Sequence, residues 1–132
     1  MKKTEIEYRV PYADTDKMGV VYYANYFVYF ERLRGEILRN AGIPYSMLEE
    51  RGLMLPVIEA YCKYKSPARY DELLTICGAV EEAKGVRIKI ACEVYRKNEL
   101  LAAGHTVHAC MNREGHPVRV PPELEALVCS HS

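Results

Sequence analysis

The spacing of the hydrophobic residues changes along the chain, and the order of these changes constrains the fold more than any other feature. Residues 5–12 alternate between apolar and polar, which predicts a half-buried strand, whereas residues 25–41 carry apolar side chains at helical spacing. Four further strand-like segments follow, at 55–65, 73–82, 86–96 and 100–111. One strand, one long helix and four strands predict an α+β fold in which an antiparallel five-stranded sheet wraps around a long central helix.

The two amphipathic segments are also predicted to have defined faces and ends. The buried face of the first strand is expected to hold Ile6, Tyr8, Val10 and Tyr12. The polar face of the helix is expected to carry Arg32, Arg34, Glu36 and Arg39. Asn25 is the expected N-cap, and Gly42 with Pro44 ends the helix, before a short second helix at 44–51. Gly35 is unfavourable in a helix, so we expect a neighbouring backbone to approach closely there.

Composition limits the class of protein. The 132 residues are expected to form a single domain, 1–132, with a loosely attached tail from about residue 117, where prolines interrupt the pattern. The charges balance at 18 basic and 18 acidic residues, which argues against nucleic-acid binding. The sequence has neither a signal-peptide pattern nor an apolar run long enough to span a membrane. Its five cysteines lack metal-ligand spacing, and we expect reduced thiols in a cytoplasmic protein.

The loop between the first strand and the helix has the residues needed for acyl-transfer chemistry. Asp14 and Asp16 follow the strand, and Gly19 precedes an aromatic cluster that leads into the helix. A carboxylate beside a helix N-terminus can attack a carbonyl carbon or activate water, while free backbone N–H groups stabilise the oxyanion. The alternative is that both acids are solvated turn residues, as in most Asp-rich loops.

Two segments resemble a known family. The run from Pro11 to Arg32, PYADTDKMGVVYYANYFVYFER, and the segment YKSPARYDE from Tyr64 to Glu72 resemble hotdog-fold acyl-CoA thioesterases of the 4-hydroxybenzoyl-CoA and Tol–Pal-associated type. The similarity extends over residues 6–111. It implies the hotdog fold, hydrolysis of an acyl-CoA thioester without a cofactor, and assembly into a homodimer or homotetramer. An acyl carrier protein is an alternative carrier of the substrate.

The resemblance also implies roles for individual residues. Asp16 would be the nucleophile or general base, Asp14 would hydrogen-bond the loop backbone, and the N–H of Tyr23 would stabilise the oxyanion. Many relatives carry histidine where Tyr23 stands, so an acid–base role for this side chain is not implied. The remaining positions assigned to substrate binding are Gly19, Val20, Tyr22, Asn25, Tyr26, Lys65 and Ser66. The tyrosines suit an aromatic or a short aliphatic acyl group equally.

Other chemistry-bearing residues have simpler interpretations. Glu31 is a second candidate acid, but pairing with Arg34 at i+3 is the more common role for such a glutamate. His105 and His108 would point to opposite faces of a strand and so would not share a metal ion. Candidate contacts for the phosphates of coenzyme A are Lys63, Lys65, Arg69, Arg87 and Lys89.

Two alternative functions fit the same fold. A hotdog dehydratase or hydratase would need a histidine to move a proton at carbon, and residues 11–32 contain none. A non-catalytic acyl-binding module is the second alternative, although Asp16 beside an intact Gly19 favours catalysis. No serine-nucleophile motif or phosphate-binding glycine loop is present.

Overall fold

A computed structural model describes residues 3–128 of the chain. Its sheet strands are β1 (Thr4–Arg9), β3 (Val57–Tyr64), β4 (Leu73–Lys84), β5 (Arg87–Arg96) and β6 (Glu99–Ala109). Its helices are α1 (Asn25–Asn40), α2 (Tyr45–Glu50) and α3 (Pro122–Glu125), with a 3₁₀ turn η1 (Tyr12–Asp14). Two short strands, β2 (Leu53–Met54) and β7 (Met111–Asn112), pair with each other. The predicted long helix and five strands are confirmed, whereas β2, β7, η1 and α3 have no counterpart in the prediction.

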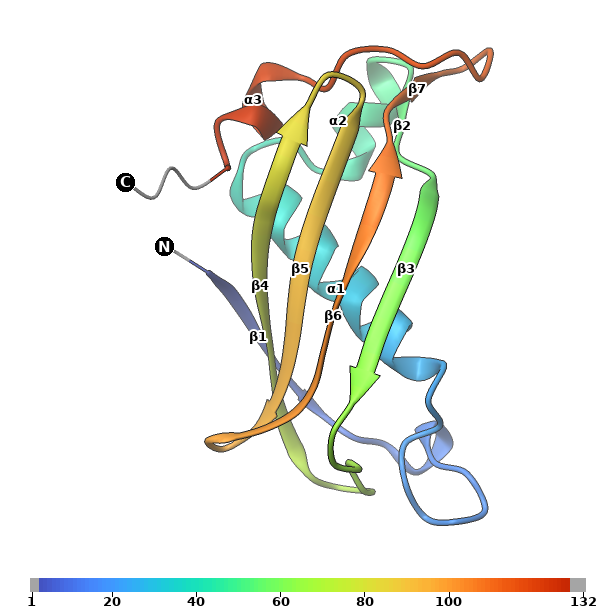
Figure 1. Cartoon of the computed structure of the whole chain (residues 1–132), viewed down its shortest axis with the longest axis vertical. Coiled ribbons are helices and arrows are strands. Elements are labelled where there is room, and N and C mark those ends of the chain that lie inside the picture. The colour runs from blue at the N-terminus through green and yellow to red at the C-terminus, as the bar shows by residue number, and fades with distance from the viewer. Residues whose placement is uncertain (1–2, 129–132) are drawn as a thin grey trace.

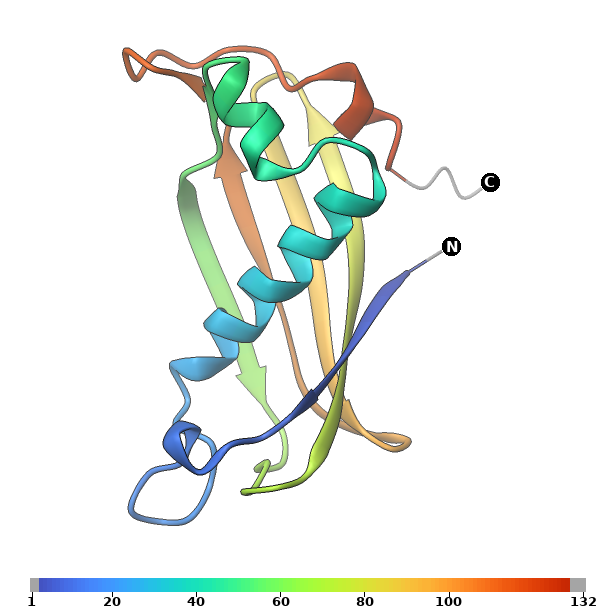
Figure 2. The same ribbon diagram turned by 180° about the vertical axis from the view of Figure 1, so that it is seen from behind.

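The five long strands form one antiparallel sheet in the order β1-β4-β5-β6-β3. Consecutive strands from β4 to β6 pair as hairpins, while β1 and β3 form the two edges. Helix α1 lies diagonally across one face of this sheet, and α2 follows it at the end distant from the η1 loop (Figures 1 and 2). The loop that joins β1 to α1 therefore lies at the same end of the molecule as the loop after β3.

The core lies between α1 and the sheet because both elements are amphipathic at the matching period. In β5, Ile88, Ile90 and Val94 are fully buried, and their partners across the core include Phe30 and Leu33 of α1. The opposite face of the sheet carries the charged alternates. Burial of this contiguous apolar surface is the main favourable contribution to folding.

Two glycines allow neighbouring strands to approach unusually closely. A Cβ atom on Gly78 would lie 2.0 Å from the carbonyl oxygen of Ala91, and one on Gly104 would lie 2.0 Å from that of Tyr61. By contrast, a Cβ on Gly35 would meet only a Tyr45 ring carbon, at 3.9 Å. The expectation of a close backbone approach was therefore wrong for the helix, and the close approaches occur within the sheet.

Three expectations about the ends and faces of elements were wrong. Ala24, not Asn25, is the N-cap of α1, and no side chain caps the helix. Tyr12 is 78% exposed, because β1 ends at Arg9 and Tyr12 begins η1 instead of continuing the strand. Arg34 is buried rather than on the polar face, because its Nε donates a hydrogen bond to the hydroxyl of Tyr45 in α2, at 2.7 Å.

The C-terminal segment is packed, which corrects the expectation of a loosely attached tail from residue 117. Val120 and Leu124 are buried in the main core, and the N–H of Val120 donates to the carbonyl of Gly85. Arg51 of the loop after α2 forms an ion pair with Glu123, at 2.7 Å. The prolines break regular structure here, but tertiary contacts still fix the chain as far as residue 128.

Candidate active site

The loop between η1 and α1 is held in place by backbone pairing. Thr15 bridges to Val21, Val20 bridges to Arg69, and the N–H of Val21 donates to the carbonyl of Ala68 at 2.8 Å. Gly19 adopts φ +80°, a conformation that side chains disfavour, and its N–H donates to the carbonyl of Asp16. These contacts fix the loop against the segment that follows β3, so the two stretches of family resemblance meet in space.

Asp16 lies within this turn and keeps one carboxylate oxygen available. Its Oδ1 accepts the N–H of Met18 at 2.8 Å and, more weakly, that of Val20 at 3.5 Å. The other oxygen, Oδ2, accepts no hydrogen bond from any residue between 3 and 128. The carboxylate is half-buried and borders a cavity of about 290 Å³. A fixed carboxylate with one unengaged oxygen suits attack on a carbonyl carbon or removal of a proton from water.

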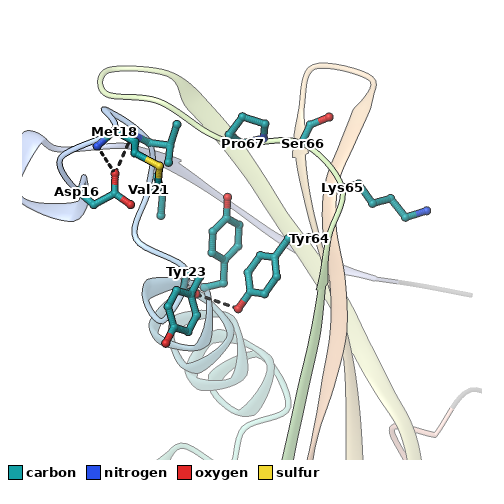
Figure 3. Close-up of a pocket in the computed structure, with 10 residues that line it drawn as sticks. Asp16, Met18, Val21, Tyr23, Tyr64, Lys65, Ser66 and Pro67 are labelled. Atoms are coloured by element: carbon teal, nitrogen blue, oxygen red, sulfur yellow. Dashed lines mark hydrogen bonds between the residues drawn. The ribbon is translucent and has the colours of Figure 1, made fainter.

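The cavity is mainly apolar and aromatic. It is lined by Asp16, Met18, Val20, Val21, Tyr23, Tyr26, Tyr64, Lys65, Ser66 and Pro67. Figure 3 shows Asp16 and Met18 on one side and Tyr64 to Pro67 on the other, with the Lys65 side chain extending away from Asp16. The structure thus brings together Asp16, Val20, Tyr23, Tyr26, Lys65 and Ser66 from the predicted site.

Three predicted site residues do not line the cavity. Gly19 shapes the turn, Tyr22 packs against the ring of Tyr23 with centroids 4.8 Å apart, and Asn25 faces the interior of the loop. Prediction from the sequence in turn missed Met18, Val21, Tyr64 and Pro67 as lining residues. Tyr64 and Pro67 lie in the second segment of family resemblance, which was a usable signal for both.

The start of α1 leaves two backbone donors without partners. The N–H groups of Asn25, Tyr26 and Phe27 donate to the carbonyls of the residues three positions earlier, at 2.9 to 3.2 Å. Within residues 3–128, the N–H groups of Tyr23 and Ala24 donate to no acceptor. These donors stand at the positive end of the helix dipole, and Tyr23 lines the cavity. They can stabilise an oxyanion, and the predicted Tyr23 amide is one of them.

Asp14 has a structural role, though not through the contacts expected of it. Its Oδ2 accepts the hydroxyls of Tyr8 at 2.6 Å and Tyr29 at 2.7 Å, instead of loop N–H groups. Its backbone carbonyl accepts the N–H of Tyr22 and the side-chain amide of Asn25, both at 2.9 Å. Asp14 thereby ties β1, the loop and α1 together. Burial, and next the hydrogen bond to Asp14, raise the pKa of Tyr8 to about 12.

Tyr64 connects the edge strand to the start of the helix. Its hydroxyl donates to the carbonyl oxygen of Tyr23 at 3.0 Å (Figure 3). Its ring makes edge contacts with Tyr26 at 5.0 Å and Tyr23 at 6.3 Å between centroids. Burial, and next the neighbouring Cys62, raise the pKa of Tyr64 well above its ordinary value.

The other candidate residues lie outside the cavity. Glu31 is exposed and does not pair with Arg34, which corrects the expected i+3 ion pair. His105 contacts Glu59 at 2.6 Å on the outer face of the sheet. His108 is buried against the carbonyl of Leu55, on the opposite face as predicted, and burial lowers its pKa.

The described part of the chain offers neither a group of side chains suited to a metal ion nor an activated cysteine thiol. No group of three or more His, Cys, Asp or Glu side chains in that part could hold a metal ion. Cys62, Cys77, Cys92 and Cys110 are free thiols, and burial raises the pKa of each. Cys129 and His131 lie outside the described residues. No helix in residues 3–128 is long and apolar enough to cross a membrane.

Comparisons of the sequence and of the fold with known proteins identify the same family. The profile of the thioesterase-like superfamily matches residues 10–128. The acyl-CoA thioesterase YbgC of Haemophilus influenzae is 36% identical over 120 residues, which cover 89% of this chain and 88% of that protein. A solved structure from Aquifex aeolicus superposes with a TM-score of 0.89 at 33% identity, covering 95% of this chain and 98% of that one. The DHNA-CoA thioesterase of Staphylococcus aureus superposes with a TM-score of 0.86 at 31% identity, covering 90% and 81%.

Proposed function

This chain belongs to the thioesterase-like superfamily, and on that basis we propose that it hydrolyses an acyl-CoA thioester to a free acid and coenzyme A. The observation that carries the proposal is Asp16, whose Oδ2 accepts no hydrogen bond within residues 3–128 and which lines an apolar cavity together with Tyr23, at the start of α1 where the amides of Tyr23 and Ala24 are free. A hydrolase of this class needs a base or nucleophile and an oxyanion site next to an acyl pocket, and these residues supply all three.

Two routes use the same atoms. In the first, Oδ2 of Asp16 attacks the thioester carbon, the C–S bond breaks, and coenzyme A leaves as a thiolate that takes a proton from water. Water then cleaves the mixed anhydride and restores the carboxylate. In the second, Asp16 removes a proton from a water molecule while the oxygen of that water attacks the same carbon. Asp16 then returns the proton to the leaving thiolate. The amides at the start of α1 would bind the oxyanion in both routes.

The acyl group is expected in the cavity and the nucleotide of coenzyme A outside it. Tyr23, Tyr26 and Tyr64 offer aromatic surface to an acyl chain or ring. Lys63, Lys65 and Arg69 are exposed and form no ion pair within residues 3–128, so they stay candidates for the phosphates. Lys89 is less suited because it pairs with Glu81 at 3.1 Å.

A hydrolysis screen tests the proposal directly. Purified protein is incubated with acyl-CoA esters of increasing length, with an aromatic acyl-CoA and with an acyl-carrier-protein thioester, and release of the thiol is followed. We expect turnover of at least one acyl-CoA. Absence of thiol release from the whole panel would contradict the thioesterase proposal. The dehydratase alternative is less favoured because no histidine between residues 3 and 128 lines the cavity.

We also propose that the active form is a homodimer or homotetramer in which a second copy pairs along β3. This edge strand exposes the apolar side chains of Val57 and Ile58, which are 48% and 50% accessible. Open edges and apolar surface of this kind favour association. A second copy on this edge would also complete the enclosure of α1.

The proposed association has a simple test. Light scattering at micromolar concentration should give the mass of a dimer or tetramer, and Ile58→Lys should shift the population toward monomer because it places a charge in the interface. A monodisperse monomer of the unaltered chain would contradict this proposal.

A cytoplasmic location is proposed as well, since the free thiols suit a reducing compartment, and cell fractionation would test it.

A further inference from the structure

Tyr64 stands apart from the other aromatic residues of the cavity because its hydroxyl bonds to the backbone at the start of the helix. The oxygen that it reaches, the carbonyl of Tyr23, belongs to the peptide group whose N–H is that of Ala24. The C=O and N–H of a trans peptide point in opposite directions, so the position of one fixes the other. A bond from Tyr64 to this carbonyl therefore sets the direction of a free amide at the start of α1, next in the chain to Tyr23, which lines the cavity with Asp16.

The same carbonyl accepts a second bond, from the N–H of Tyr26 at 3.2 Å. Hydrogen bonds to the oxygen of a peptide group polarise it and make its N–H a stronger donor. The Ala24 amide belongs to the peptide group that carries both bonds. The Tyr23 amide shares its peptide group with the carbonyl of Tyr22, which within residues 3–128 accepts only the N–H of Asn25. Tyr64 therefore affects both the direction and the donor strength of the Ala24 N–H.

We propose that Tyr64 is a positioning residue that aims and polarises the Ala24 amide, and that this amide stabilises the oxyanion together with the Tyr23 amide. The inference rests on the proposed thioesterase function. It adds a second backbone donor and a side chain, from a different strand, that controls it. Because β3 is an edge strand, movement of this edge would be transmitted to the oxyanion site through the Tyr64 hydroxyl and through its ring contacts with Tyr23 and Tyr26.

The deciding experiment compares Tyr64→Phe with Tyr61→Phe. Tyr64→Phe removes only the hydroxyl, and we expect kcat to fall about tenfold with little change in KM, less than the 10²–10³ lost with an oxyanion donor itself. Tyr61 lies on the same strand, stacks on His105 and lines no part of the cavity. Its phenylalanine variant should keep the parent kcat. Both variants should melt within about 5 °C of the parent, since a single partly exposed hydrogen bond is lost at most.

A spectroscopic measurement makes the test independent of turnover. The carbonyl carbon of Tyr23 and the amide proton of Ala24 should shift in the NMR spectrum of Tyr64→Phe and stay unchanged in Tyr61→Phe. Unchanged resonances, or an active parent whose kcat is insensitive to Tyr64→Phe, would overturn the inference. An inactive parent that still shows the shifts would contradict the proposed function instead, and a rise in KM alone would make Tyr64 a binding residue and refute the positioning role.

Discussion

Asp16→Asn is expected to lower kcat at least about 10²-fold while leaving the fold intact, the loss typical of removing a general acid–base group. The asparagine oxygen can still accept the N–H of Met18, so the turn should persist. What disappears is the negative charge and the basic Oδ2, the atom that accepts no hydrogen bond from the rest of residues 3–128. The measurement is steady-state kinetics on the best acyl-CoA of the screen, together with a melting curve.

Asp14→Asn is the matched control because it makes the same chemical change two residues away. Asp14 accepts two tyrosine hydroxyls on one oxygen, and an amide there would meet one or both of these donors with a poorer acceptor. We expect a lower melting temperature together with a smaller loss of kcat. If Asp16→Asn turned over within a few-fold of the parent, Asp16 would be neither the nucleophile nor the general base. Glu31, exposed on α1, would be the next residue to replace.

The secondary structure was predictable because its signals are local. In β5 and α1 one face is buried in the core. The alternation in β5 and the helical spacing of Phe30, Leu33 and Ile37 therefore follow directly from which side chains are buried. The turns that join β4 to β5 and β5 to β6 depend on local residues as well, with Gly85 and Lys97 at positive φ. For these features, residues close in sequence determine the outcome.

The residues that were assigned wrongly have a different feature in common. Each has its partners in another helix or strand, which a local sequence pattern does not reveal. Arg34 was placed on the polar face by its charge, yet Tyr45 of α2 gives its Nε a partner inside the protein. Leu124 follows a run of prolines, and nothing in the local pattern shows that it packs into the main core. The partners of Asp14 come from β1 and α1, fifteen residues apart for Tyr29, so the spacing of the acids alone could not identify them.

The candidate site was predictable in part for the same reason. Asp16 and Tyr23 lie in one continuous motif, and the resemblance singled them out together. Tyr64 comes from a strand 41 residues after Tyr23, and the hydroxyl-to-carbonyl bond that joins them depends on how β3 passes the start of α1. Sequence resemblance marked the segment that contains Tyr64, but only the three-dimensional arrangement indicates what its hydroxyl contacts.

Gly104→Ala is expected to destabilise the protein by about 3 kcal/mol or more, a loss that belongs to overpacked sites. The added methyl carbon would lie 2.0 Å from the carbonyl oxygen of Tyr61 and 2.9 Å from the Cα of Cys62. Both are backbone atoms of the paired strand β3, so no side chain can rotate away. Urea denaturation of the parent and the variant measures the change in the free energy of unfolding.

Gly35→Ala is the control for Gly104→Ala, because the free energy of unfolding is expected to change in the opposite direction. In an exposed strand or helix, alanine is favoured over glycine by roughly 0.5–1 kcal/mol, so propensity alone predicts that both substitutions stabilise. At Gly35 the new methyl group meets only ordinary contact, at 3.9 Å, and stabilisation of up to about 1 kcal/mol is expected. At Gly104 the close approach of β3 should reverse the sign. Equal effects at the two positions would mean that the sheet relaxes freely around Gly104.

Gly104→Ala should also lower kcat. Gly104 pairs with Cys62, two residues before Tyr64, so a displacement of β3 at this point should disturb the hydrogen bond from the Tyr64 hydroxyl.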